Sequence, residues 1–447
     1  MSLLSPALRT LDRLQPLRIS GRVAALRGLV VLVHDLPLPV GSLVEIGDAR
    51  IAGEVVGFDA RHSIVMTLGN LAAAGIRPGD RVVGRHASAT IGVGRALRGR
   101  VINGLGQPID GKGPITGTSP RDLEPPPLGP MARRRISEPM VTGVRAIDLF
   151  TTLGRGQRLG IFAGPGVGKS TLLGSIARCA RSDVNVVALI GERGREVKDF
   201  IEESLGEEGL ARSVVVVATG DESPLMRVRA ALVACAIAEG FRDAGDHVLL
   251  MMDSVTRLAH AQRQIGLSVG EPPATRGYTP SVFAFLARLL ERAGSVESGG
   301  SVTGLYTVLV EGDDMTEPVA DAARGILDGH IILSRKLAQR AHFPAIDVLD
   351  SVSRVADEVT DATHIAARRQ CIRLLALHRE VEDLVQIGAY ARGSSPETDI
   401  ALAYHPRLIE LLRQDPGDTE PFEQAKSRMI KTAVEAGAAL QNATKRK

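Results

Sequence analysis

The stretch Ala163-Gly164-Pro165-Gly166-Val167-Gly168-Lys169-Ser170 decides what fold this sequence predicts. An apolar run precedes it, and a helical pattern begins at Thr171. Glycines let backbone N–H groups turn inward around phosphate oxygens, and a helix N-terminus adds the positive end of its dipole. Lys169 supplies a charge for the β- and γ-phosphates and Ser170 a hydroxyl for Mg²⁺. The pattern therefore predicts a nucleotide phosphate site, although Ala163 stands where the strict motif has glycine.

Length and composition limit the class of protein. The 447 residues allow two or three domains. The net charge of +3 gives no whole-chain argument for nucleic-acid binding. Apolar runs are too short to span a bilayer, and residues 1–6 show no signal-peptide pattern. Three separate cysteines lack metal-ligand spacing. These features predict a reduced, cytoplasmic protein.

Residues 1–18 and residues 19–88 differ from the rest of the chain in the spacing of their apolar residues. Residues 1–18 carry Leu4, Leu8 and Leu11 on one face, which predicts a short amphipathic helix that either packs on its own domain or docks a partner or membrane surface. Residues 19–88 hold short apolar runs broken by Gly or Pro, at 29–33, 51–56, 63–67 and 81–83, which predicts strands there and a small β-barrel. Phe58 is the only aromatic residue there, so an oligomerisation collar is favoured over a base-stacking surface.

Residues 89–359 alternate apolar runs with helical patterns, which is typical of a doubly wound α/β domain. The turn-rich stretch 99–110 and a proline-rich connection precede the first expected strand. Residues 360–447 have helical spacing throughout, so we expect a C-terminal helical domain. The expected strands are 158–162, 185–190, 213–218, 247–252, 301–310 and 330–333, and the expected C-terminal helices are 365–377, 398–412 and 421–440.

Carboxylates follow two of these strands. Asp253 ends a buried strand in the Walker B manner, where it can hold Mg²⁺ directly or through water. Glu192 is the first carboxylate after another strand and is our candidate for orienting the attacking water, with Glu196 as a rival one helical turn away. Arg354 has the character of an arginine finger only by comparison with ring ATPases.

Six stretches in one order resemble the type III protein-export ATPases, which are related to the catalytic subunits of rotary ATP synthases. The similarity covers most of the chain from about residue 20, and Ala163 is common in export ATPases. The stretches are 163–170, 191–197, 253–257, 271–278, 311–314 and 344–354.

The resemblance implies a role for each matching position. Lys169 and Ser170 would bind phosphate and Mg²⁺, Asp253 would orient the Mg²⁺ shell, and Glu192 would activate water. Arg193 and Arg257 would line the γ-phosphate side, and Arg354 would act across a subunit boundary. Phe343 would stack on adenine and Tyr390 would close the same pocket, although both have a core-packing alternative. The implied nucleotide-binding set is Ala163, Gly164, Pro165, Gly166, Val167, Gly168, Lys169, Ser170, Thr171, Phe343 and Tyr390.

The same resemblance implies a homohexameric ATPase that releases chaperones and unfolds export substrates, using ATP and Mg²⁺. Its partners would be a dimeric negative regulator at residues 1–18, a central stalk, and a membrane export gate at the inner face of the cytoplasmic membrane. Glu311–Asp314 would either contact the stalk or form a simple acidic turn. The amino-acid sequence of residues 388–396 favours the flagellar branch over the injectisome branch.

Three other functions remain open. A catalytic subunit of a rotary proton or sodium ATPase is disfavoured by Ala163 and by the amino-acid sequences of residues 191–197 and 271–278. An RNA-translocating ring is disfavoured by the aromatic-poor barrel, so no nucleic-acid partner is expected. A nucleotide-binding scaffold without turnover is disfavoured by the presence of Glu192.

Overall fold

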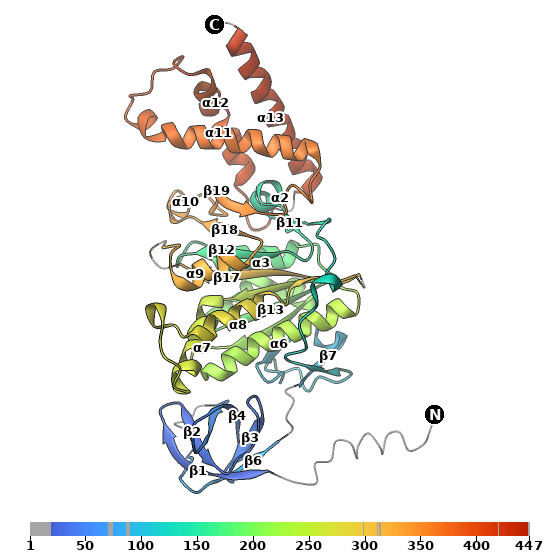
Figure 1. Cartoon of the computed structure of the whole chain (residues 1–447). Coiled ribbons are helices and arrows are strands. Elements are labelled where there is room, and N and C mark those ends of the chain that lie inside the picture. The colour runs from blue at the N-terminus through green and yellow to red at the C-terminus, as the bar shows by residue number, and fades with distance from the viewer. Residues whose placement is uncertain are drawn as a thin grey trace.

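The computed structural model describes residues 19–69, 75–85, 90–297, 299–310, 312, 314–418 and 420–445. Three parts follow one another along the molecule: a barrel, a sheet with helices on both faces, and a group of C-terminal helices (Figure 1). The predicted fold class is confirmed. The predicted helix in residues 1–18, and Glu311 and Asp313 of the acidic stretch, lie outside the described residues.

The N-terminal part is a closed, antiparallel six-stranded barrel in the order β1-β2-β5-β4-β3-β6. Its interior is filled by aliphatic side chains such as Val31, Val33 and Val65. Two strands, β1 and β3, had not been predicted, because only alternate residues of these strands turn inward and neither has a continuous apolar run. The strands are β1 (Ser20–Arg27), β2 (Val30–His34), β3 (Leu43–Ile46), β4 (Ile51–Phe58), β5 (Ser63–Thr67) and β6 (Arg81–Gly84).

A large sheet forms the centre, with the strand order β19-β18-β12-β17-β15-β13-β14-β8. Its neighbours are parallel except for the edge strand β19, which runs antiparallel to β18. All six predicted strands are present, while β8 lies inside the stretch 99–110 that was interpreted as turns. The strands are β8 (Arg100–Asn103), β12 (Arg158–Ala163), β13 (Val184–Ile190), β14 (Ser213–Ala218), β15 (His247–Asp253), β17 (Ser301–Leu309), β18 (Gly329–Leu333) and β19 (Ile346–Ser353).

Helices cover both faces of this sheet, and consecutive strand residues point to opposite sides. Phe162 packs in one core with the helices α6 to α9, whereas its neighbours Ile161 and Ala163 pack in a second core with α3 and the C-terminal helices. This double burial explains why the strands are apolar along their whole length. The helices are α3 (Lys169–Cys179), α4 (Gly194–Asp199), α5 (Gly206–Ala211), α6 (Pro224–Asp243), α7 (Val255–Ser268), α8 (Pro280–Leu290), α9 (Pro318–Ile326) and α10 (Arg335–Gln339), with a π-helical turn at Phe200–Leu205 between α4 and α5.

Several short strands, 3₁₀ turns and one short helix lie between the barrel and the large sheet or at the ends of that sheet. The strands β7 and β9 pair with each other, β10 pairs with β11, and β16 pairs with β17. The helix α2 lies beneath the C-terminal helices (Figure 1). These elements are β7 (Thr90–Val93), the 3₁₀ turns Arg95–Leu97, Pro130–Ala132 and Thr275–Gly277, β9 (Ser119–Asp122), β10 (Pro139–Met140), α2 (Arg145–Phe150), β11 (Leu153–Gly154) and β16 (Gly294–Ser295).

The C-terminal part consists of α11 (Ala362–Gln386), α12 (Pro396–Leu412) and α13 (Phe422–Lys445). Side chains cap two of these helices: the Asp361 carboxylate accepts from the His364 N–H, and the Ser395 hydroxyl accepts from the Thr398 N–H. The helices pack on one another and on α2. No helix in the described ranges is both long and apolar enough to cross a membrane.

Candidate active site

The phosphate loop connects β12 to α3, as the sequence predicted. Gly166 and Gly168 have φ values of 76° and 88°, a region that favours glycine, and Gly168 is the N-cap residue immediately before α3. Lys169, Ser170 and Thr171 form the first turn of α3. The loop thus brings the N-terminus of α3 and the side chains of its first turn together, and this arrangement can bind an anion such as a phosphate.

The side chains of Lys169 and Asp253 meet at the carboxyl ends of β12 and β15. The Lys169 Nζ lies 2.5 Å from Asp253 Oδ1. The same carboxylate oxygen accepts a 2.7 Å hydrogen bond from the hydroxyl of Thr307 on β17, the strand between the two. Asp253 is 4% exposed, so its position is fixed by these two donors and by its own strand. Thr307 was not identified from the sequence, although a polar residue near the end of an apolar strand is a signal for it.

Glu192 follows β13 and turns into the same site. Its Oε1 lies 3.7 Å from Lys169 Nζ and 3.2 Å from Arg257 Nε. This oxygen is buried and makes no hydrogen bond with any described residue. A buried carboxylate oxygen between two cations, with an unused acceptor, has the character needed to orient a water molecule.

Burial raises the pKa of Glu192 to about 7, and a hydrogen bond with Glu196 and the nearby charge of Asp253 act in the same direction. Lys169 and Arg257 oppose this shift. The pKa of Glu196 is lowered by the same hydrogen bond. The pKa values of the two carboxyl groups thus shift in opposite directions, that of Glu192 upward and that of Glu196 downward, so Glu196 influences the protonation of Glu192.

The two arginines expected near the γ-phosphate have different surroundings. Arg257 is the third residue of α7, and its Nη1 donates a 2.9 Å hydrogen bond to the Gly191 carbonyl. Gly191 has a φ of 74°, and a Cβ there would lie 2.9 Å from the Arg257 side chain, so glycine is required. Arg193 instead is 82% exposed and pairs at 3.5 Å with Glu196. Arg257 is partly buried and contacts Glu192 and Gly191, whereas Arg193 is largely exposed beside the site.

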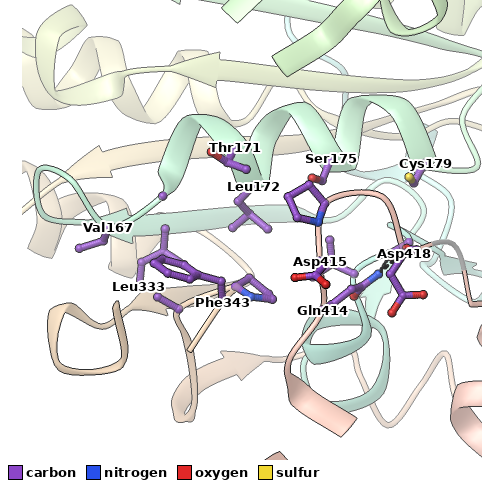
Figure 2. A pocket seen from close by; sticks show the side chains of 16 residues that line it. Val167, Thr171, Leu172, Ser175, Cys179, Leu333, Phe343, Gln414, Asp415 and Asp418 are labelled. Atoms are coloured by element: carbon purple, nitrogen blue, oxygen red, sulfur yellow. Dashed lines mark hydrogen bonds between the residues drawn. The ribbon is translucent and has the colours of Figure 1, made fainter. Parts of the chain in front are cut away.

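A cavity of about 320 Å³ lies beside the phosphate loop. Figure 2 shows Phe343 beside Val167 and Leu333, with Thr171 and Leu172 of α3 above it. The Phe343 ring is 46% exposed, so its face is accessible from the cavity rather than packed in the core. The opposite end of the cavity is formed by the segment after α12, which contributes Gln414, Asp415, Pro416 and Asp418.

Tyr390 does not reach this cavity in the described chain. It lies between α11 and α12, where its hydroxyl donates to Asp399 Oδ1 at 3.1 Å and to the Ser395 carbonyl at 3.3 Å. Neither Tyr390 nor its loop is among the residues that line the cavity. The C-terminal wall of the cavity is made by residues 414–418 instead, which sequence reasoning missed because nothing in their pattern distinguishes them from a surface turn.

Arg354 lies at the edge of the sheet opposite to its own phosphate loop. It directly follows β19, whose last residue, Ser353, pairs with Gly329 at the start of β18. The phosphate loop follows Ala163, which pairs with Leu333 at the end of β18. Strands rise about 3.3 Å per residue, so the two points are separated by roughly 15 Å along the sheet. The Arg354 side chain is exposed there, at the edge of the sheet opposite to the phosphate loop of its own chain.

The residues at the phosphate loop fit a magnesium ion bound with a nucleotide. Mg²⁺ prefers oxygen ligands, and the Ser170 hydroxyl and the Asp253 carboxylate are the matching donors. Within the described ranges, no group of three or more His, Cys, Asp or Glu side chains could hold a metal. The remaining ligands would then be water and nucleotide phosphate, as is usual for Mg²⁺ in such sites.

Fold and site together define a P-loop ATPase with a barrel before and helices after its nucleotide-binding domain. Two family models match: the ATP synthase alpha/beta family, nucleotide-binding domain, over residues 143–353, and the T3SS EscN ATPase C-terminal domain over residues 360–431. The chain belongs to the type III export ATPases of the ATP synthase alpha/beta family, and it is an ATP-hydrolysing enzyme.

Individual relatives cover nearly the full length of the chain. The flagellum-specific ATP synthase of Bacillus subtilis strain 168 is 54% identical over 406 residues, 90% of this chain and 92% of that protein. The type 3 secretion system ATPase of Xanthomonas euvesicatoria is 49% identical over 407 residues, 90% of this chain and 91% of that protein. Assembled EscN from enteropathogenic E. coli, in complex with its central stalk EscO, has a TM-score of 0.86 at 40% identity and covers 92% of this chain and 100% of that one.

Proposed function

We propose that this protein is a homohexameric ATPase that energises flagellar protein export, releasing chaperones and unfolding substrates. The proposal that the subunits form a ring rests on the position of Arg354, which is about 15 Å along the sheet from the phosphate loop of its own chain. An arginine there acts on a nucleotide only if the nucleotide belongs to an adjacent copy. Identical subunits joined head to tail close into a ring when the rotation allows it.

The proposed site is divided between two subunits. Residues 163–171 hold the phosphates, Ser170 and Asp253 hold Mg²⁺ when ATP is bound, and Glu192 orients water. Arg257 positions Glu192 and Arg193 lies toward the γ-phosphate. Phe343 stacks on the base in the cavity beside the loop, while Tyr390 contributes only through a rearrangement or a neighbouring copy. Arg354 of the next subunit stabilises the charge of the transition state.

The flagellar assignment rests on the wording of 388–396 and on the 54% identity to the Bacillus subtilis flagellar relative. The injectisome assignment is the alternative, because the Xanthomonas type 3 secretion relative is 49% identical. Capture of the stalk protein from the native host tests the branch: a flagellar stalk supports the proposal, and an injectisome stalk contradicts it.

We further propose that the ring sits under a membrane export gate at the inner face of the cytoplasmic membrane. A central stalk is included because the similar EscN assembly is in complex with its stalk EscO. Residues 1–18 are the proposed contact for a dimeric negative regulator, and residues 19–88, 89–359 and 360–447 are the proposed barrel, ATPase and helical domains. No nucleic-acid partner is proposed.

The decisive experiment is native mass spectrometry of the purified chain with Mg²⁺ and ATP, together with phosphate release. A hexamer that hydrolyses ATP without another subunit is the expected result. Activity that appears only after a second, different subunit is added would favour a rotary ATPase instead. Hydrolysis stimulated by RNA would favour an RNA-translocating ring.

A further inference from the structure

The segment after α12 is attached to the nucleotide-binding domain through one buried arginine, Arg145 of α2. This residue is 8% exposed and directly follows Gly143 and Val144, which line the cavity beside the phosphate loop. Its guanidinium donates from Nε to the Leu411 carbonyl at 3.0 Å and from Nη2 to the Arg413 carbonyl. These two carbonyls belong to the end of α12, where backbone acceptors lack partners within the helix.

The same guanidinium also holds the acidic residues that follow. Its Nη1 pairs with Asp418, and with Glu420 Oε2 at 3.0 Å. Arg145 thereby contacts both ends of residues 411–420. Asp418 lines the cavity, so the ion pair fixes one of the cavity's walls. The planar, forked guanidinium suits this arrangement because it can serve carbonyls and carboxylates at once, whereas a lysine ammonium is a single point charge.

Gln414 completes the connection between Arg145 and Phe343. Its side-chain Oε1 accepts from the Arg145 backbone N–H at 2.8 Å, and its Nε2 donates to the Gly143 carbonyl at 2.8 Å. Its own backbone N–H donates to the Phe343 carbonyl at 2.9 Å. Hydrogen bonds thus lead from the backbone of α2 through Gln414 to the Phe343 carbonyl, next to the aromatic side chain that lines the cavity.

We propose that Arg145 is a positioning residue for nucleotide-base binding, which holds residues 414–418 and Phe343 around the base. The inference rests on the proposed function of this cavity as the base site. The hydrogen bonds and ion pairs of the Arg145 side chain are all with residues 411–420 among the described residues, so its role is limited to the base end of the nucleotide. The phosphate end is bound by a different set of groups and does not depend on it.

The test compares ligands with and without a base. Dissociation constants for Mg·ADP and for magnesium pyrophosphate are measured by calorimetry for wild type and Arg145→Ala. We expect ADP to bind about tenfold more weakly to the variant, and pyrophosphate to bind within about twofold of wild type. In steady-state assays KM for ATP rises while kcat changes by less than about twofold. Equal weakening of both ligands, or unchanged ADP binding, overturns the proposal.

Two further variants keep the result interpretable. Arg145→Lys retains the positive charge opposite Asp418 and Glu420 but lacks the forked guanidinium. It provides the same comparison of ligands if Arg145→Ala fails to fold. We expect a smaller loss of ADP affinity than in Arg145→Ala, and unchanged pyrophosphate affinity. If Arg145→Ala does not fold, unchanged ADP binding in folded Arg145→Lys overturns the proposal. Arg407→Ala is the matched control, because Arg407 pairs at 2.6 Å with Glu435 on the exposed side of α12 and α13. It should bind both ligands as wild type does.

Phe343→Ala separates this inference from the proposed function of the cavity. If Phe343→Ala weakens ADP binding and Arg145→Ala does not, only the role of Arg145 is wrong. If Phe343→Ala leaves ADP binding unchanged, the cavity is not the base site and both assignments fail. Thermal unfolding of each variant checks that the loss of ADP affinity occurs in a folded protein.

Discussion

The ammonium of Lys169 contacts the carboxylate of Asp253 at 2.5 Å, although the two residues are separated by 84 positions in the sequence. The Thr307 hydroxyl donates to the same oxygen of Asp253. The lysine that we propose for the phosphates and the carboxylate that we propose for the magnesium are thus held together by three neighbouring strands. Variants of these two residues should therefore separate phosphate binding from catalysis.

Lys169→Ala should weaken Mg·ATP binding about 10- to 100-fold, because charge-assisted hydrogen bonds to phosphate are lost. Asp253→Asn should retain most of this affinity, since Lys169 remains, but should lower kcat about 100-fold through loss of metal positioning. Equilibrium binding and phosphate release measure the two effects. Similar affinities for the two variants would contradict the division of roles.

Glu192→Gln should lower kcat by about 10²–10⁴-fold while leaving Mg·ATP affinity near that of wild type, because the amide cannot accept the proton of the attacking water. Single-turnover phosphate release with a nucleotide-binding assay measures both quantities. The neighbouring Glu196→Gln is the control and should retain turnover. Full activity in Glu192→Gln would move the role of base to another residue.

The pH profile of kcat should report the raised pKa of Glu192, which is about 7. A general base acts in its ionised form, so kcat should fall as the pH drops below about 7 and level off above it. Glu196→Gln removes a hydrogen bond that raises this pKa, so the midpoint should move to lower pH. An unchanged midpoint in Glu196→Gln would show that the carboxyl pair does not set the profile.

Arg354→Ala should lower turnover by about 10³–10⁵-fold if the residue acts as a finger. Mixing Arg354→Ala with Glu192→Gln subunits restores intact interfaces, because each variant supplies the half that the other lacks. Random mixing should recover about a quarter of wild-type activity in a head-to-tail ring. Phosphate release after denaturing and co-refolding, or after co-expression, checks this expectation. No recovery in mixed rings would place Arg354 in its own subunit's site.

Acid should weaken the packing of α11 against α12 in the C-terminal part. His378 and His405 stack with ring centroids 3.4 Å apart, and burial lowers the pKa of His405 to about 4, assisted by the charges of His378 and His342 and of Arg340, against the opposing effect of Glu382. Burial also lowers the pKa of His378, and burial with the nearby Arg413 lowers that of His342.

A histidine whose folded pKa is depressed stays neutral while the unfolded chain takes up a proton, so stability is lost as the pH falls from about 6.5 toward 4. Because His405 is only partly buried, we expect a loss of about 1 kcal/mol between pH 7.5 and pH 5. His405→Phe should reduce this loss. Urea unfolding at the two pH values measures it, and equal acid sensitivity of variant and wild type would rule out the histidine pair as the cause.

The phosphate loop, Asp253 and Glu192 could be predicted because each lies directly after an apolar strand, and the carboxyl ends of parallel strands meet at one edge. The strands themselves were recognisable because both faces of the sheet are buried. β1, β3, β8 and the edge strand β19 were missed, since a half-exposed or turn-flanked strand leaves no continuous apolar run.

What the sequence by itself determined is the local chemistry: the glycines of the loop, the lysine, and the carboxylates at strand ends, whose roles follow from positions a few residues away. Contacts between distant segments were decided only by the tertiary structure. Thr307 reaches Asp253, Glu196 acts on the pKa of Glu192, and Arg145 joins α2 to the segment after α12. Such contacts depend on strand order and helix packing, and these arise from the burial of the whole core rather than from any local pattern.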